Sequence, residues 1–210
     1  MKMNKLILTG VLSIALFLGA CGSDSKTTLS TDGKSSDSAP PNADKGEIVK
    51  FDIDTEKSIV VWRGSILSIK DHTGTLNFKS GGVKVQGNEV LDGGLVVDMT
   101  TMAATDANYD EKNTKEGLIG HLMSDDFFNT VEFGAATLVF KKPGTAALSI
   151  RDKTNEESYT DVSVSEENGK KVVKAKMTFD RQKYGVAFAG PTKDILISDE
   201  IELDVTLYEK

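Results

Sequence analysis

The chain has 210 residues, of which 39% are hydrophobic and 27% are charged, and its formal net charge is −7. These proportions are typical of a soluble globular protein. The acidic balance argues against nucleic acid as a partner and against flat binding to anionic lipid, and the single cysteine excludes a disulfide within the chain.

The first twenty residues form a pattern of their own. Lys2 and Lys5 precede an almost unbroken apolar run, Leu6–Leu18, which is short for a membrane-spanning helix. This order predicts a secretory signal peptide over residues 1–20. The stretch Leu18-Gly19-Ala20-Cys21 resembles the lipobox of bacterial lipoproteins, which implies cleavage before Cys21 and a diacylglycerol on its thiol. The alternative is an ordinary signal peptide followed by an incidental cysteine.

The next stretch is polar. Residues 22–45 are rich in Ser, Thr, Asp, Lys and Pro and contain one isolated leucine, so they cannot bury enough apolar surface to order themselves. We therefore expect residues 21–46 to form a lipidated cysteine with a disordered tether, and residues 47–210 to form one domain. With two acyl chains on Cys21 the protein would be held stably in the cell envelope, at the outer membrane, facing either the periplasm or the outside.

From residue 46 onward the hydrophobic pattern has a period of two, which predicts strands. Thr75–Lys79 and Gly82–Val85 flank Ser80-Gly81, which suggests a hairpin, and Asp92-Gly93-Gly94 is expected to open the next strand. A second hairpin turn is expected at Asn168-Gly169. The other predicted strands cover residues 58–64, 95–99, 131–141, 146–151, 160–165, 171–180 and 200–207.

One segment has a helical pattern. Asn113 stands three residues before Glu116, a start signal, and an apolar stripe follows, made of Leu118, Ile119, Leu122 and Met123. This helix lies in a predicted non-strand segment, residues 100–130, whose length is typical of a functional or structural lid. The pattern predicts an all-β fold, an antiparallel barrel of about eight strands with one inserted helix, in preference to a sandwich.

The domain has few residues that could act in catalysis or bind a metal. The domain has two histidines, His72 and His121, which stand 49 positions apart, and it has neither a nucleophile motif nor a glycine-rich phosphate loop. Zinc sites normally draw on more His and Cys ligands at tighter spacing. We expect no metal, no cofactor and no catalytic residue. Both histidines are instead predicted to hydrogen-bond backbone at a polar barrel mouth.

Several segments together resemble the YceI-like family of lipid- and polyisoprenoid-binding proteins, and the lipoprotein form resembles members from the Bacteroidetes. They are Val61-Trp62-Arg63-Gly64, Asp71-His72-Thr73-Gly74-Thr75, Leu91-Asp92-Gly93-Gly94, Gly120-His121-Leu122-Met123-Ser124-Asp125-Asp126-Phe127-Phe128, Ala147–Thr154 and Phe179–Val186. The resemblance implies a lipocalin-like barrel whose apolar bore holds one long isoprenoid or acyl chain, in a non-catalytic protein.

The candidate ligand-binding residues lie on the apolar side of their predicted strands or directly after the helix. They are Trp62, Leu76, Phe78, Leu95, Val97, Phe127, Phe128 and Phe179. Trp62, the sole tryptophan, is expected to share one face with Val60. Because a small barrel has one interior, these side chains form either the wall of a cavity or a solid core, and composition does not separate the two. The predicted function is a membrane-tethered carrier of a long-chain lipid; the alternative is a structural, adhesion or stress-linked envelope domain without a ligand.

Overall fold

A continuous antiparallel sheet closes on itself in the computed structural model, which describes residues 46–66, 70–188 and 197–210. The predicted signal peptide, Cys21 and the predicted tether up to residue 45 therefore fall outside the described residues. Within them the strands are β1 (Ile48–Asp52), β2 (Ile59–Ile66), β3 (Lys70–Gln86), β4 (Glu89–Ala104), β5 (Ala135–Lys142), β6 (Thr145–Ile150), β7 (Lys153–Glu167), β8 (Lys170–Asp180) and β9 (Ile197–Tyr208). The described part also contains one α-helix, α1 (Lys115–Met123), and a 3-10 turn, η1 (Arg181–Tyr184), and none of its helices is long and apolar enough to cross a membrane.

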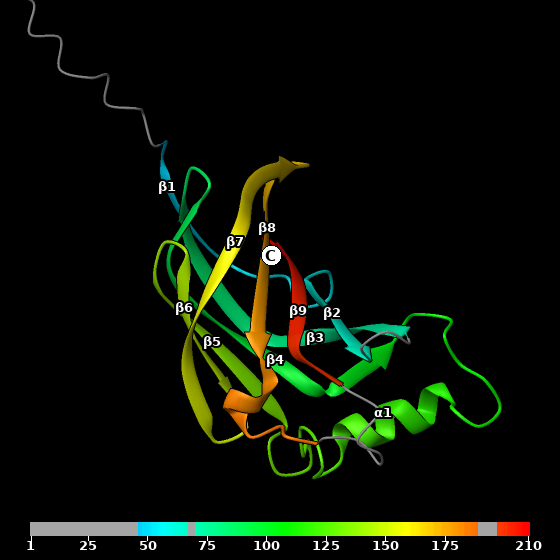
Figure 1. Cartoon of the computed structure of the whole chain (residues 1–210). Helices are drawn as coiled ribbons and strands as arrows, with labels where there is room; N and C mark the ends of the chain where they lie inside the picture. The colour runs from blue at the N-terminus through cyan, green and yellow to red at the C-terminus, as the bar shows by residue number, and fades with distance from the viewer. Residues whose placement is uncertain (1–45, 67–69, 189–196) are drawn as a thin grey trace, which may run out of the picture. The chain divides into compact units, whose positions relative to one another are not determined.

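Strands β2 to β9 form the barrel, and β2 closes it by pairing with β3 on one edge and β9 on the other (Figure 1). At the closure Trp62 of β2 lies opposite Gly74 of β3 and Leu203 of β9. Strand β1 continues along the same edge of β3, beside Gly82–Gln86. The predicted all-β antiparallel lipocalin-like barrel of eight strands with an inserted helix is thus confirmed.

Side chains alternate along each strand, so every second one points into the barrel. On β2, Val60 and Trp62 are buried, whereas Val61 between them is 36% exposed, as the sequence predicted. The turn before β8 is also as predicted: Asn168 and Gly169 adopt positive φ angles of 52° and 77°. The period-two pattern therefore identified the inward face correctly.

The predicted hairpin at Ser80-Gly81 is wrong. β3 runs unbroken from Lys70 to Gln86, and the turn between β3 and β4 falls at Gly87 and Asn88. The glycine-rich stretches lie inside two long paired strands, where the register shifts between Phe78 and Ser80 and inward side chains change from even to odd positions. Glycines inside strands often mark such bulges and close backbone approaches.

Gly93 shows why glycine is needed inside the paired strands β3 and β4. Its φ is 132°, and a Cβ at this position would lie 2.3 Å from the carbonyl oxygen of Gly82. Asp92-Gly93-Gly94 therefore lies within β4 rather than opening it. β4 also continues to Ala104, so the non-strand segment is shorter than expected, and β5 starts at Ala135 rather than at residue 131.

Helix α1 begins one residue later than the predicted start signal. Thr114 caps it, with its Oγ1 accepting a hydrogen bond from the backbone N–H of Gly117 at 3.0 Å, while the Asn113 side chain bonds Asp110. The apolar stripe Leu118, Ile119, Leu122 and Met123 is half-buried and packs against the core.

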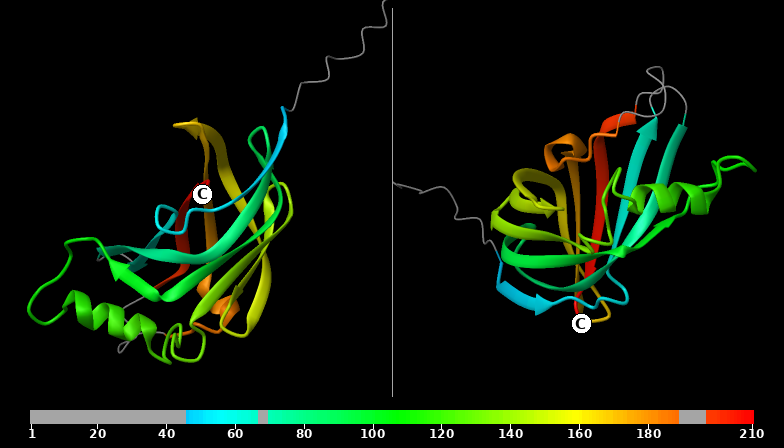
Figure 2. Two further views of the ribbon diagram at one scale, coloured as in Figure 1. Left: turned by 180° about the vertical axis from the view of Figure 1, so that it is seen from behind. Right: turned by 90° about the horizontal axis from the view of Figure 1, so that it is seen from below.

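The two ends of the barrel differ. Figures 1 and 2 place α1 and η1 at one end and β1 at the other. The β1 end is closely packed, with Val83, Val85 and Val172 almost fully buried. We call the α1 end, where His72 lies on β3, the mouth.

Candidate functional site

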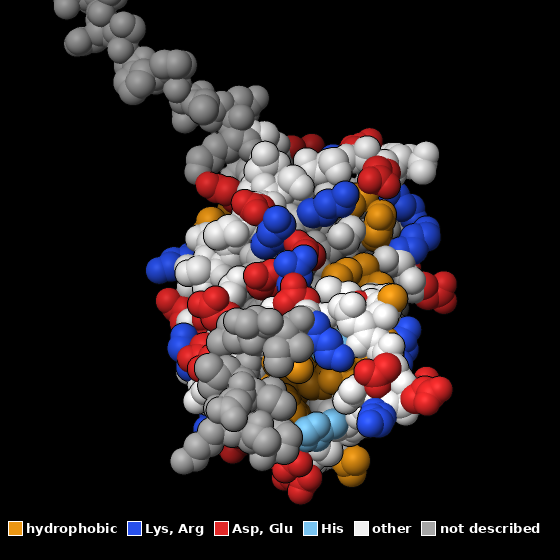
Figure 3. All heavy atoms as spheres, turned by 45° about the vertical axis from the view of Figure 1, so that its right-hand side comes forward, with side chains coloured by type: hydrophobic (Ala, Val, Ile, Leu, Met, Phe, Trp, Pro, Cys, Tyr) orange, Lys and Arg blue, Asp and Glu red, His pale blue; other side chains and the backbone are white. Residues whose placement is uncertain are grey.

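The barrel interior is not solid: it contains a cavity of about 560 Å³. All eight barrel strands contribute side chains to its wall, and nearly all of them are apolar. This volume is within the range of small-molecule sites, roughly 300–1,000 Å³. Figure 3 shows apolar side chains inside a hollow, with a histidine at its rim.

All the side chains predicted to line a bore do line this cavity: Trp62, Leu76, Phe78, Leu95, Val97, Phe127, Phe128 and Phe179. Six of them are buried, and Val97 and Phe128 are half-buried. That they contact a ligand stays a prediction.

The wall also includes residues that the sequence analysis did not select. Ile201, Leu203 and Val205 of β9 belong to the clearest period-two pattern in the chain, so their inward position could have been inferred. Arg181 and Phe188 also line the cavity; Arg181 falls within the Phe179–Val186 segment of the family resemblance, but the segment after β8 has no periodicity to show that either side chain points inward.

Both histidines line the cavity. The predicted hydrogen bonds from their rings to backbone are wrong: within the described residues each ring instead faces a carboxylate. Nε2 of His121 lies 3.5 Å from the carboxylate of Asp126. The His121 ring packs edge-on against Phe127 and Phe188, with centroids 5.0 and 4.7 Å away. His121 thus forms part of an aromatic rim at the mouth.

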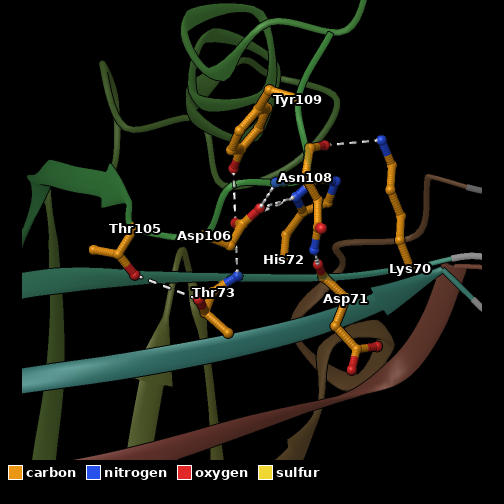
Figure 4. Close-up of polar contacts among 8 residues, drawn as sticks. All are labelled: Lys70, Asp71, His72, Thr73, Thr105, Asp106, Asn108 and Tyr109. Atoms are coloured by element: carbon orange, nitrogen blue, oxygen red, sulfur yellow. Dashed lines mark hydrogen bonds and ion pairs between the residues drawn. The ribbon is translucent and has the colours of Figure 1, made fainter.

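His72 has a different partner, Asp106, which follows the end of β4. Nδ1 of His72 lies 3.3 and 3.4 Å from the two carboxylate oxygens of Asp106, and the Tyr109 ring stacks on the imidazole with 5.2 Å between centroids (Figure 4). The His72 side chain is 11% exposed. This contact joins β3 to the segment that leads into α1.

Asp106 is the centre of this network. Its carboxylate accepts hydrogen bonds from the backbone N–H groups of Thr73 (3.0 Å) and Asn108 (2.9 Å) and from the Tyr109 hydroxyl (2.8 Å). Burial alone would raise the pKa of Asp106, but the hydrogen bonds donated to its carboxylate outweigh burial and lower the pKa to about 2. Burial and the Asp106 carboxylate together raise the pKa of Tyr109 to about 12. At neutral pH the site therefore holds an ionised carboxylate and a neutral phenol.

The guanidinium of Arg181, which lines the cavity, is already hydrogen-bonded within the protein. Arg181 is 3% exposed and donates to the carbonyl oxygens of Val186 at 2.6 Å and Ser198 at 2.9 Å, and to the carboxylate of Asp199 at 3.0 Å. These bonds fasten η1 to the start of β9. Across the described ranges, no three His, Cys, Asp or Glu side chains are grouped so that they could hold a metal ion.

Solved structures of low sequence identity share this fold. BcnA from Burkholderia cenocepacia matches with a TM-score of 0.59 and 17% identity, over 75% of this chain and 99% of its own. A polyisoprenoid binding domain from Saccharophagus degradans, implicated in plant cell wall breakdown, matches with a TM-score of 0.50 and 16% identity, over 76% of this chain and 97% of its own.

The curated proteins contain no match to the chain. The model of the YceI-like domain, by contrast, matches residues 51–208, which include every strand of the barrel and the whole cavity wall. The chain therefore belongs to the YceI-like domain family.

Proposed function

We propose that this protein binds one long-chain apolar lipid, a polyisoprenoid or a fatty-acyl chain, in the barrel cavity and carries it without chemical change. The observation that carries the proposal is the enclosed apolar cavity of about 560 Å³, lined from all eight strands. The Saccharophagus degradans relative, described as a polyisoprenoid binding domain, supports the same ligand class.

The energetics of burial favour such a ligand. A chain of about 15–20 carbons gains roughly 12–16 kcal/mol when it leaves water, at about 0.8 kcal/mol per methylene group. Association costs roughly 4–15 kcal/mol in lost motion and ordering. The net therefore ranges from negligible to tight binding, so burial gives a water-insoluble chain a reason to enter the cavity but does not fix its affinity.

The sole tryptophan provides a direct test. Trp62 lies on the cavity wall, so titration with the C15 isoprenoid alcohol farnesol should change its fluorescence saturably at one ligand per protein, because the ligand replaces the surroundings of the indole. Native mass spectrometry of the purified protein should show the same one-to-one complex. An unchanged signal with every long-chain lipid, and no lipid in the mass spectrum, would favour a structural envelope domain instead.

We further propose that the protein is anchored in the cell envelope through lipidated Cys21, most simply at the outer membrane. The motivation is the order of charge, apolar run, small residues and cysteine in residues 1–21. Cys21→Ser should abolish labelling by radioactive palmitate and leave the precursor unprocessed, since it removes the acylated thiol. Equal labelling of the variant and the wild type would contradict the anchor.

A further inference from the structure

The wall of the cavity is apolar except at a few polar atoms near the mouth, and His72 presents one of them. Its ring lines the cavity, while its Nδ1 edge faces Asp106. In the described ranges, 46–66, 70–188 and 197–210, the other ring nitrogen, Nε2, forms no hydrogen bond. A polar atom on an apolar wall is a natural contact for the polar end of a ligand.

Asp106 determines the chemical character of that atom. An ionised carboxylate can only accept hydrogen bonds, so Nδ1 of His72 must carry a proton to bond it. In the neutral ring Nε2 is then left with its lone pair and accepts. The three other donors to Asp106 hold the carboxylate in place, so the orientation and tautomer of His72 are set before any ligand arrives.

A second, independent observation concerns Trp62. The side chain is 7% exposed, and its indole Nε1–H is buried with no hydrogen-bond partner among the described residues. Trp62 lies opposite Gly74, the next inward position of β3 after His72. By register Trp62 lies diagonally across from His72 on the neighbouring strand, so a ligand group held at Nε2 of His72 would lie beside the indole.

We propose that the ligand in this cavity ends in a neutral hydroxyl group, which donates a hydrogen bond to Nε2 of His72. The ionised Asp106 behind the imidazole disfavours a second negative charge at this point, which argues for an alcohol over a phosphate. This inference rests on the proposed function and adds the head group that the cavity selects.

The experiment compares three probes with the same C15 chain: farnesol, its methyl ether and farnesyl phosphate. Isothermal titration calorimetry of the purified protein should show farnesol binding roughly five- to tenfold more tightly than the ether, the value of one hydrogen bond. His72→Phe should bring farnesol down to the affinity of the ether and leave the ether unchanged. His121→Phe is the matched control, because it changes the other histidine of the same cavity wall and should keep the preference.

Asp106→Asn tests the positioning role of the carboxylate. The amide can donate to Nδ1, which allows the proton to move to Nε2 and turns the acceptor into a donor. The preference for farnesol over the ether should therefore shrink or invert, and the ¹⁵N shifts of the His72 ring should report the changed tautomer. This spectroscopic readout stands even if His72→Phe fails to fold.

The outcomes separate this inference from the proposed function. If the wild type binds farnesol and the ether equally, or binds farnesyl phosphate most tightly, the hydroxyl inference is wrong and the lipid-binding function stands. If none of the three probes binds the wild type, the proposed function fails, and the head-group inference fails with it.

Discussion

Replacing Ala136 by phenylalanine is expected to abolish lipid binding and leave the barrel folded. Ala136 is buried on β5 opposite Val97, and both side chains line the cavity. A phenyl ring placed there occupies space that a ligand chain would need, so affinity for farnesol should fall at least tenfold. Because the ring enters a cavity rather than a filled core, stability should stay unchanged or rise by about 1 kcal/mol. Native mass spectrometry and thermal unfolding measure the two effects.

The control is the adjacent position. Ala135 is exposed on the outer face of β5, so Ala135→Phe adds the same ring outside the barrel and should bind farnesol like the wild type. If Ala136→Phe overpacks the wall and unfolds, Ala175→Phe tests the same idea from β8, where Ala175 also lines the cavity. Normal farnesol binding by a folded cavity-filled variant would place the ligand outside the bore.

The largest loss of stability is expected from Gly74→Ala. A Cβ at Gly74 would lie 1.9 Å from the carbonyl oxygen of Ala103 and 2.4 Å from Cζ2 of Trp62. The first contact is with backbone, which cannot rotate away, so β3 and β4 would have to separate where they pair. We expect the free energy of unfolding to fall by about 3 kcal/mol or more, measured by urea denaturation.

Gly120→Ala is the matched control for this substitution. Gly120 lies within α1, and nothing stands within 4 Å of its would-be Cβ. Since alanine is a better helix former than glycine by about 1 kcal/mol, this variant should be neutral or slightly more stable. Equal stability of the two variants would mean that neither the carbonyl oxygen of Ala103 nor the indole of Trp62 lies against Gly74.

Much of the fold could be predicted because each barrel strand has one face toward solvent and one face toward the interior. Period-two alternation identifies the buried face directly, and a small barrel has a single interior for it to enter. The six predicted wall residues on strands therefore all line the cavity although their strand boundaries were imprecise, and Phe127 and Phe128, which follow the helix, line it as well. The strand pattern and the size of the domain already favoured a barrel over a sandwich, and the family resemblance added that the barrel is lipocalin-like.

The errors have physical causes as well. Glycine interrupts the pattern both at turns and at bulges, so Gly81 and Gly93 suggested chain reversals where two long strands bend together. The pairing of His72 with Asp106 joins residues 34 positions apart, and Asp106 lies past the end of β4, in a stretch without strand or helix. Asp110 competes for Asn113, which left Thr114 to cap α1. The His72–Asp106 contact depends on tertiary geometry, whereas the choice of cap was a local competition between neighbouring polar side chains, which the start signal alone does not decide.

The described chain enters and leaves the barrel at the β1 end, the end opposite α1 (Figure 1). Ile48 pairs with Gln86, and the backbone N–H of Lys210 donates to the carbonyl oxygen of Asp52, so residues 46 and 210 both lie away from the mouth. A peptide tag, a fluorescent label or a sensor surface joined at either place should leave the opening free. The protein can thus be attached to a sensor chip through either of these positions with its mouth accessible. Binding of different lipids can then be compared by passing them over the same surface.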